Sequence, residues 1–212
     1  MSDTVNGKRL FISTLILVIV HLAGIIGINS PYRDFFLVLS PLNLLLSAML
    51  LLWNHKRFNA ATIIFLAITA TAGFLVEVAG VHTHIIFGSY DYGKTLGLKL
   101  FDVPLIIGIN WLMLVYCAGT IVNKLNADIF VKSLTGAALL VAMDLLIEPV
   151  AIKYDFWDWY EGTVPLRNYI AWYVVSFLLL LLFNKLQFNK ENKLAQSLFI
   201  IQLIFFAALC AF

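Results

Sequence analysis

Charged residues are scarce in this sequence. Of its 212 residues, 12% are Asp, Glu, Lys or Arg, whereas 62% are hydrophobic. A soluble domain is about 25% charged and about 45–50% apolar, so this chain has too few charges to cover a water-facing surface. The shortage excludes an ordinary soluble protein and predicts a protein that crosses a membrane several times.

Other residue types are too few for several familiar functions. The two cysteines, Cys117 and Cys210, lie in apolar runs without CxxC spacing, so we expect neither a disulfide framework nor a cysteine-bound metal. Four histidines are too few for a membrane di-iron oxygenase, and no glycine-rich phosphate-binding motif indicates a nucleotide cofactor. The last apolar run has no lysine for a retinal Schiff base. A net charge of +2 without a block of like charges predicts no nucleic-acid partner.

The sequence does contain long apolar runs. A bilayer core about 30 Å thick takes about 20 apolar residues per helix, and polar or turn-forming residues divide the chain into runs of about this length. The candidate spans are residues 10–28, 35–53, 60–80, 104–123, 129–152, 168–186 and 195–212. The loops are too short for a second domain. We therefore predict an all-α, polytopic integral membrane protein, with one transmembrane helical domain over 1–212 and about seven transmembrane helices.

The basic residues predict the orientation of these spans. Cytoplasmic loops of membrane proteins carry an excess of Lys and Arg. With a cytoplasmic N-terminus, the cytoplasmic side holds Lys8, Arg9, Lys56, Arg57, Lys124, Lys132, Lys185, Lys190 and Lys193, and the opposite side holds Arg33, Lys94, Lys99, Lys153 and Arg167. The bias predicts a multi-pass protein of the cell inner (cytoplasmic) membrane whose N-terminus is cytoplasmic and whose C-terminus is outside.

Three carboxyl groups lie inside the predicted spans. Glu77 is in the third span and Asp144 is at a similar depth in the fifth, while Glu148 follows Asp144 by four residues and shares its helix face. Ionisable residues within a membrane are expensive and usually mark a function. Burial and like-charged neighbours favour the protonated form of a carboxyl, so we expect at least one of the three to hold a proton at neutral pH.

Two loops on the outer side are unusual. Residues 81–103 are too apolar for a solvated loop and are punctuated by glycines, which favours a re-entrant or interfacial segment between spans 3 and 4. Residues 153–172 interleave Trp and Tyr with acidic residues, and this mixture suits a pocket that stabilises positive charge against aromatic rings. His82 and His84 could bind a metal together with Glu77. Two histidines in a loop are more often ordinary polar residues, so we expect no metal.

Motifs from these helices and loops occur in two blocks. The first block holds Glu77-Val-Ala-Gly80-Val-His-Thr83, Phe87-Gly88-Ser-Tyr90-Asp-Tyr92-Gly93, Asp102-Val-Pro104 and Asn110-Trp111. The second holds Asp144-Leu-Leu-Ile-Glu148-Pro149, Phe156-Trp157-Asp158-Trp159, Val164-Pro165 and Asn168-Tyr-Ile-Ala-Trp172. Together they resemble the carotenoid biosynthesis membrane protein family, which includes carotenoid 1,2-hydratases and archaeal C50 carotenoid hydratases. His84 departs from the family pattern, which favours a small residue, usually Gly, at this position.

The resemblance implies a cofactor-independent enzyme that adds water across the C1–C2 double bond of an acyclic (ψ) end group. Its substrate would be a carotenoid of the γ-carotene or lycopene type, and its other partners would be water, the lipid bilayer and other enzymes of the carotenoid pathway. A buried acid protonates C2, aromatic faces stabilise the tertiary cation at C1, and a carboxylate deprotonates the attacking water.

The resemblance also gives roles to the candidate residues. We expect Asp144 to be the proton donor, with Glu77 and Glu148 as base and proton-sharing partner in an order that stays open. The further catalytic candidates are Asp102, Asp155 and Asp158. The substrate-binding candidates are Tyr90, Tyr92, Trp111, Trp157, Trp159 and Trp172, with Asn110 and Asn168 to position water.

Two alternatives stay open at this point. A lycopene-type cyclase protonates the same bond but lets a neighbouring alkene capture the cation. A non-enzymatic carotenoid-binding or proton-coupled membrane protein would use the carboxyls as a relay, although a transporter is expected to show an internal repeat and none is visible in the sequence.

Overall fold

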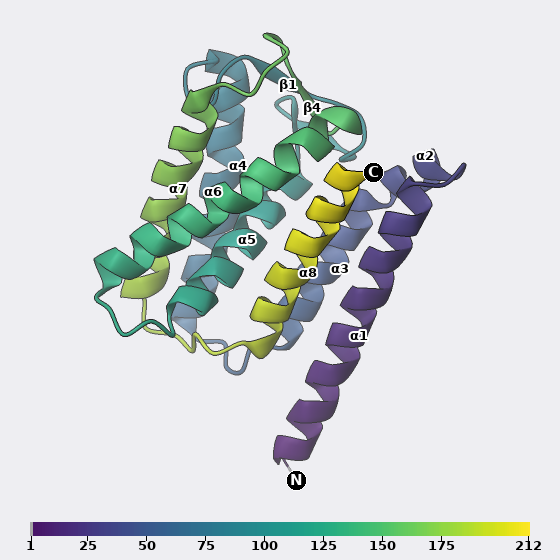
Figure 1. Cartoon of the computed structure of the whole chain (residues 1–212). Helices are drawn as coiled ribbons and strands as arrows, with labels where there is room; N and C mark the ends of the chain where they lie inside the picture. Colours follow the sequence, from purple (N-terminus) through teal and green to yellow (C-terminus); the bar gives the residue numbers. More distant parts are fainter. Residues whose placement is uncertain (1) are drawn as a thin grey trace.

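The structure, a computed structural model, describes residues 2–212, with side chains described from Gly7 onward. Its helices are α1 (Ser2–Ile28), α2 (Arg33–Val38), α3 (Ser40–Trp53), α4 (Ala60–Thr83), α5 (Ile106–Val122), α6 (Ile129–Lys153), α7 (Leu166–Lys185) and α8 (Lys193–Ala211). Figure 1 shows the long helices as one bundle, with the start of α1 at the lower end and the C-terminus at the upper end.

The helices have the lengths and composition of a membrane protein. Within the described residues, five are long and apolar enough to cross a bilayer, namely α1, α4, α6, α7 and α8. Two shorter apolar helices, α3 and α5, occupy the other predicted ranges. The body of the protein is therefore the predicted all-α membrane bundle. Of the seven expected spans, five are helices long enough to cross a bilayer.

The predicted span 35–53 is two helices rather than one. α2 ends at Val38, and α3 begins at Ser40 with Pro41 in its first turn. Proline has no backbone N–H, and its ring collides with the carbonyl four residues earlier in a continuous helix. Hydrophobicity alone could not reveal this break, because the residues on both sides of Pro41 are equally apolar.

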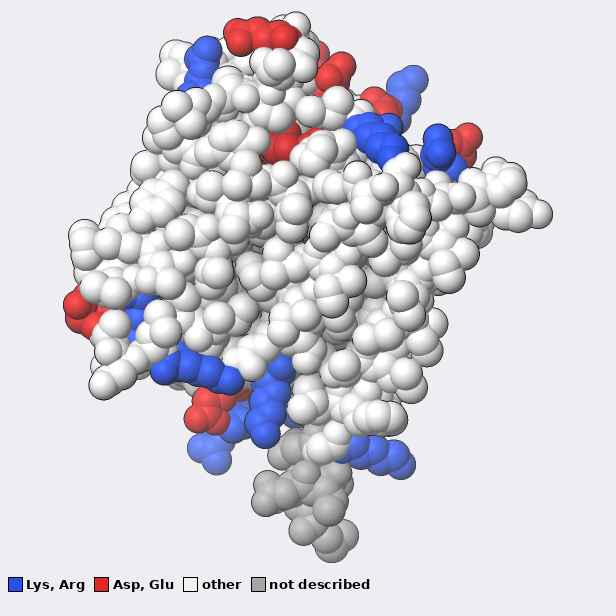
Figure 2. All heavy atoms as spheres, in the orientation of Figure 1, with Lys and Arg blue, Asp and Glu red and all other residues white. Residues whose placement is uncertain are grey.

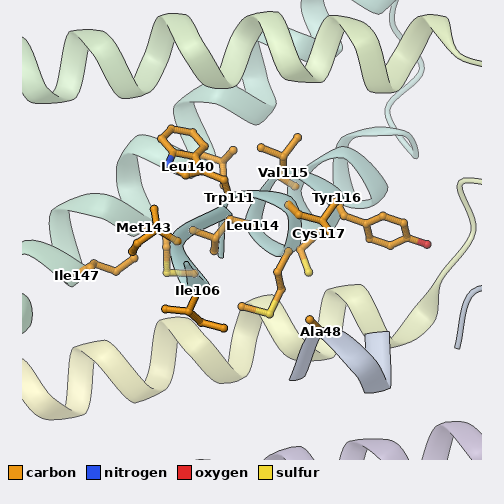
Figure 3. Packing of buried hydrophobic residues seen from close by; sticks show 14 of the residues in the cluster. Ala48, Ile106, Trp111, Leu114, Val115, Tyr116, Cys117, Leu140, Met143 and Ile147 are labelled. Carbon is orange, nitrogen blue, oxygen red and sulfur yellow. The ribbon is translucent and has the colours of Figure 1, made fainter. Parts of the chain in front are cut away.

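Helix α5 lies at the centre of the bundle. Fourteen of its 17 residues are buried, and Figure 3 shows its side chains packed among Ala48 of α3 and Leu140, Met143 and Ile147 of α6. A helix surrounded by protein on all sides does not need an exposed apolar surface of full bilayer length. This central position explains why α5 is shorter than its neighbours.

A small folded cap covers the upper end of the bundle. Strand β1 (Tyr90–Tyr92) pairs antiparallel with β4 (Trp157–Trp159), and β2 (Lys99–Leu100) pairs antiparallel with β3 (Val103–Pro104). The two outer loops of the sequence are thus joined in one structure, which Figure 1 shows above α4 to α7. These strands were not expected from the sequence. The buried side chains of Phe87 and Leu96 attach the 84–105 segment to the bundle.

The end of α4 explains the unusual position of His84. This residue has φ 56° and is the left-handed C-cap of the helix, where its backbone N–H donates to the carbonyl of Gly80. Glycine adopts this conformation without steric cost and is the residue most often found there. The small residue expected from the family pattern is therefore the one that this turn favours.

Charge is distributed unevenly between the two ends of the molecule. Figure 2 shows an uncharged band around the middle, Lys and Arg at both ends, and most of the acidic residues at the upper end. The band has the composition expected of a surface that contacts lipid. The cap and the acidic residues thus share one end, opposite to the basic end.

The contact between α4 and α5 gives a test of the packing. A Cβ atom built on Gly108 would lie 2.7 Å from the backbone carbonyl oxygen of Ala70, so Gly108→Ala should separate the two helices. Overpacking of this kind costs about 1–3 kcal/mol. We expect the free energy of unfolding of Gly108→Ala, measured with denaturant in detergent micelles, to fall by this amount.

The matched control is Gly7→Ala, because nothing lies within 4 Å of the added Cβ. An exposed helical Gly→Ala change is neutral or stabilising by up to about 1 kcal/mol. A Gly108→Ala protein as stable as the parent would show that α4 and α5 do not pack this closely.

Candidate active site

A small cavity lies beneath the cap, between the upper parts of four helices. Its walls come from α4, α5, α6 and α7 and from the paired strands β1 and β4. It is lined by Glu77, Phe87, Tyr90, Tyr92, Ile107, Asn110, Trp111, Glu148, Trp157, Trp159, Asn168 and Trp172. The cavity volume is about 20 Å³, which is room for about one water molecule. Two acids and seven aromatic rings from distant parts of the sequence therefore meet around a space of this size.

Glu77 reaches the cavity from α4 and is held by three aromatic donors. Its Oε2 accepts hydrogen bonds from the hydroxyls of Tyr90 at 2.5 Å and Tyr92 at 2.8 Å, and its Oε1 accepts from the indole of Trp111 at 3.0 Å. The carboxyl is 5% exposed. Two of the three donors belong to the cap, so this buried acid joins the cap to α4 and α5.

Glu148, which reaches the cavity from α6, has a similar environment. Its Oε2 accepts from the indole nitrogens of Trp157 at 3.1 Å and Trp159 at 2.8 Å, and its Oε1 accepts from the amide of Asn168 at 3.1 Å. Both strands of the cap sheet thus donate to a buried carboxyl, β1 to Glu77 and β4 to Glu148. The alternation of inward residues along each strand produces this result, because side chains two positions apart face the same side.

Asp144 lies one helical turn below Glu148 and is not on the cavity wall. It is completely buried, and its Oδ2 accepts a hydrogen bond of 2.8 Å from the same Asn168 amide nitrogen that donates to Glu148. Its Oδ1 is buried without a hydrogen-bond partner. Asn168 therefore links two carboxyls on one helix face, of which Glu148 faces the cavity and Asp144 lies behind it.

The three carboxyls are surrounded by neutral donors rather than by bases. Over residues 7–212, the acid–base pairs within 4.0 Å are Lys56–Glu191 and His82–Asp102, and neither contacts the site. Burial, followed by the nearby Glu77 carboxyl, raises the pKa of the Tyr90 and Tyr92 phenols well above its usual value. Both phenols therefore keep their protons and act as donors to Glu77.

Aromatic rings form the rest of the wall. The indoles of Trp111 and Trp172 are stacked, with ring centroids 4.2 Å apart, and the rings of Tyr90 and Trp159 lie 4.9 Å apart. Asn110 adds a half-buried amide to the lining. The faces of such rings attract positive charge, so this wall can stabilise a cation next to two carboxyls.

Three of the candidate acids lie elsewhere. Asp102, Asp155 and Asp158 are exposed and do not line the cavity. Asp102 lies 4.0 Å from His82, Asp155 accepts from the backbone N–H of Lys94, and Asp158 accepts from the backbone N–H of Trp159. Each of these three carboxyls makes its contact on the outer surface of the cap rather than in the cavity.

The two histidines considered as metal ligands, His82 and His84, do not hydrogen-bond to the Glu77 carboxyl. All three acceptor contacts of that carboxyl are taken by Tyr and Trp donors, and His82 faces Asp102 instead. In the part of the chain that the structure describes, no group of three His, Cys, Asp or Glu is placed to hold a metal ion.

Two lining residues and one role were not expected from the sequence. Phe87 and Ile107 complete the wall; Phe87 begins one of the family motifs and could have been found from it, whereas Ile107 is an apolar residue in apolar surroundings without a distinguishing signal. The Tyr and Trp residues were expected to bind substrate, whereas four of their indole and phenol groups in the cap donate to Glu77 and Glu148. The signal for this role was available, because Tyr90-Asp-Tyr92 and Trp157-Asp-Trp159 both alternate with the period of a strand.

Comparison with known proteins identifies the family. The family model described as carotenoid biosynthesis protein matches residues 36–212, which include the whole cavity. Bisanhydrobacterioruberin hydratase of Haloarcula japonica is 31% identical over 118 residues, which are 51% of this chain and 40% of that protein. The chain thus matches less than half of the length of this relative. No solved structure matches. Because the family match covers most of the chain, the protein belongs to the carotenoid biosynthesis protein family.

Proposed function

We propose that the protein is a carotenoid hydratase that adds water across the C1–C2 double bond of an acyclic (ψ) carotenoid end group. The observation that carries the proposal is the cavity of about 20 Å³, in which two carboxyls and a wall of aromatic rings surround space for one water. The similarity to a bisanhydrobacterioruberin hydratase supports hydration as the reaction. The substrate would be a long acyclic carotenoid such as lycopene or γ-carotene.

The proposal includes seven membrane crossings in the cell inner membrane, with a cytoplasmic N-terminus. It is supported by the alternating directions of α1, α3, α4, α5, α6, α7 and α8 in Figure 1, where the chain passes between the lower and upper ends at each of them. The basic lower end would face the cytoplasm. The shorter α5 can cross within the bundle because protein surrounds it.

The Asp144–Glu148 pair supplies the proton in this proposal. The two carboxyls share the Asn168 amide as a donor, and two like charges this close are not both ionised easily. Asp144 has the fewer donors and a buried oxygen without a partner, so it is the member that holds a proton at rest. Asp144 passes this proton to Glu148, which faces the cavity and transfers it to C2 of the alkene.

Glu77 acts as the base. Three donors to its carboxyl favour the ionised form, and it faces Glu148 across the space for water. Protonation of C2 leaves a tertiary cation at C1. Glu77 removes a proton from the water as its oxygen bonds to C1, and the product is a tertiary alcohol. The proton then returns from Glu77 to the Asp144–Glu148 pair through the next water in the cavity, which restores the acid and the base. No electrons are exchanged, so the reaction needs neither an oxidant nor a reductant.

The aromatic wall stabilises the cation between these two steps. The stacked Trp111 and Trp172 indoles and the Tyr90–Trp159 pair present ring faces and edges to the cavity. A cation over a desolvated ring gains about 2 kcal/mol. A full aromatic wall therefore lowers the barrier to a cation that is otherwise unstable in an apolar medium.

Substrate entry requires the cap to move. A cavity of about 20 Å³ cannot hold a carotenoid end group. The β1–β4 sheet is the mobile element in this proposal, because it covers the cavity and is joined to the bundle through hydrogen bonds to Glu77 and Glu148. On its outer face Asp91 lies directly opposite Asp158, and like charges in this position weaken a strand pair.

The reaction can be tested in a lycopene-producing bacterial host. Expression of the protein should yield carotenoids heavier by the mass of one water per hydrated end, detected by mass spectrometry. A product of unchanged mass but altered absorption would instead indicate a cyclase, and unchanged lycopene would contradict both activities.

The same assay tests the proton donor. Asp144→Asn keeps the size of the side chain but removes its acid, and general acid catalysis contributes about 10²–10⁴-fold. We expect hydration to fall by this factor at equal yield of folded protein, and Glu77→Gln and Glu148→Gln to lose similar activity. Asp158→Asn, the same substitution on the exposed face of the cap, is the control and should retain activity. An equal loss of activity in Asp158→Asn would indicate that the proton donor lies in the cap. Full activity of Asp144→Asn would show that Asp144 takes no part in the reaction.

Movement of the cap can be tested with a disulfide. Asp91 and Asp158 are paired across β1 and β4, and opposed residues of this kind have the separation that a disulfide needs. In a Cys210→Ser background, the oxidised Asp91→Cys/Asp158→Cys protein should be inactive and should recover on addition of a reductant. Each single cysteine variant should be active under both conditions. Full activity of the oxidised double variant would show that the sheet does not have to open.

The topology can be tested at the C-terminus. A reporter that is active only in the cytoplasm, fused after Phe212, should be silent, because an odd number of crossings places the two termini on opposite sides. An active reporter would mean an even number of spans.

A further inference from the structure

A second cavity lies at the opposite end of the bundle from the candidate active site. It is formed where α1 begins, where α3 and α5 end and where α8 begins, and its volume is about 740 Å³. Its polar lining includes Arg9, Lys56, Lys124, Lys190, Lys193 and the buried residue Thr120. The proposed reaction uses none of these residues. A cavity of this size at the basic end therefore needs its own explanation.

The charges around this basic cavity are not balanced. Glu191 is the acidic residue in its lining, and it pairs with Lys56. Among the side chains described from Gly7 to Phe212, no acid lies within 4.0 Å of Arg9, Lys124, Lys190 or Lys193. Figure 2 shows basic side chains gathered at this end. Within the described residues, the lining therefore has five basic side chains against one acidic side chain, Glu191.

Two hydrogen-bond donors in the lining have no acceptor. The Nε of Arg9 and the hydroxyl of Thr120 are buried without hydrogen-bond partners, and Thr120 is 2% exposed. A buried polar group without a partner costs about 1–3 kcal/mol. The arrangement leaves these donors available to a ligand that accepts hydrogen bonds.

Lys190 also lines the cavity and has no acidic partner within the described residues. Its ammonium group donates to the Asn184 carbonyl and lies 5.7 Å and 5.6 Å from the ring centroids of Phe183 and Phe188. Burial, followed by the charge of nearby Lys132, lowers the pKa of Lys190. A bound anion would raise the pKa of Lys190 again, because its negative charge stabilises the protonated ammonium group.

We propose that the basic cavity binds a phosphate group, carried by an anionic lipid. Phosphate has several acceptor oxygens and matches a set of Arg, Lys and hydroxyl donors. The cavity is much larger than a phosphate ion, and Leu10 of the apolar helix α1 also lines it, so it has room for a headgroup with its adjoining apolar part. A soluble phosphate compound has the same acceptor chemistry, and the experiment separates the two sources. The site is independent of the proposed hydratase activity.

Binding can be measured by isothermal titration of the purified full chain in an uncharged detergent. The probes are dihexanoyl phosphatidic acid, dihexanoyl phosphatidylcholine and inorganic phosphate. We expect saturable binding of about one phosphatidic acid per chain, with at least about 10-fold weaker binding of the other two. Binding of inorganic phosphate as tight as that of phosphatidic acid would overturn the lipid assignment. Absence of saturable binding for all three would overturn the site.

Variants distinguish binding inside the cavity from non-specific attraction of an anion to a basic surface. Lys190→Gln and Arg9→Gln should each weaken binding of phosphatidic acid about 10-fold, since a hydrogen bond to a charged group contributes about this factor. Lys185→Gln removes the same charge from an exposed position outside the cavity and should leave the affinity unchanged. Equal weakening by Lys185→Gln would overturn the proposal.

Thr120→Val is a variant that keeps the net charge. Its hydroxyl makes no hydrogen bond in the structure, so the protein should fold normally, yet the ligand loses a donor. We expect several-fold weaker binding of phosphatidic acid, a change that surface charge cannot produce. Unchanged affinity in Thr120→Val together with Lys190→Gln would show that the phosphate does not enter the cavity.

Discussion

The carboxyls of Glu77 and Glu148 are buried among apolar helices, and no Lys or Arg side chain lies against them within the described residues. Burying an acid without hydrogen bonds is costly, so these two groups require donors from elsewhere in the chain. The cap supplies them, through Tyr90 and Tyr92 to Glu77 and through Trp157 and Trp159 to Glu148. The pairing of β1 with β4 and the closure of the bundle both follow from this requirement.

The same hydrogen bonds connect the fold with the proposed chemistry. When the cap is closed, donors surround both carboxyls and the space between them holds about one water. If the cap opens as proposed, the two acids would lose four donors and would become accessible to water. Closure over a substrate would then exclude solvent and orient the acid, the base and the remaining water in one step. In the proposed mechanism, the strand pair that stabilises the fold would also admit the substrate.

Polarity along the bundle axis separates two kinds of site. At the upper end, acids lie among aromatic rings without bases. At the lower end, bases surround a larger cavity that has one acid, and that acid is paired with Lys56. Between them the buried helix α5 carries apolar side chains over most of its length.

The sequence by itself determined the class of the protein and the approximate ends of most of its helices. Hydrophobicity and the need for about 20 apolar residues per span act locally, so composition and spacing were sufficient. Ten of the twelve residues that line the cavity were among the site candidates named from the resemblance, whereas Asp144, Asp102, Asp155 and Asp158 were candidates that do not line it. The break before Pro41 and the shorter α5 depended on proline geometry and on the surroundings of each helix.

Only the tertiary structure decided which acids meet. Glu77, Glu148 and Asn168 come together because α7 packs against both α4 and α6 and because β1 pairs with β4 across 65 residues of chain. The same packing places Asp144 behind Glu148 and leaves Asp102, Asp155 and Asp158 exposed on the cap. Contacts between residues distant in the sequence, and the direction of each side chain, follow from packing and strand register. Neither can be read from residue type and spacing.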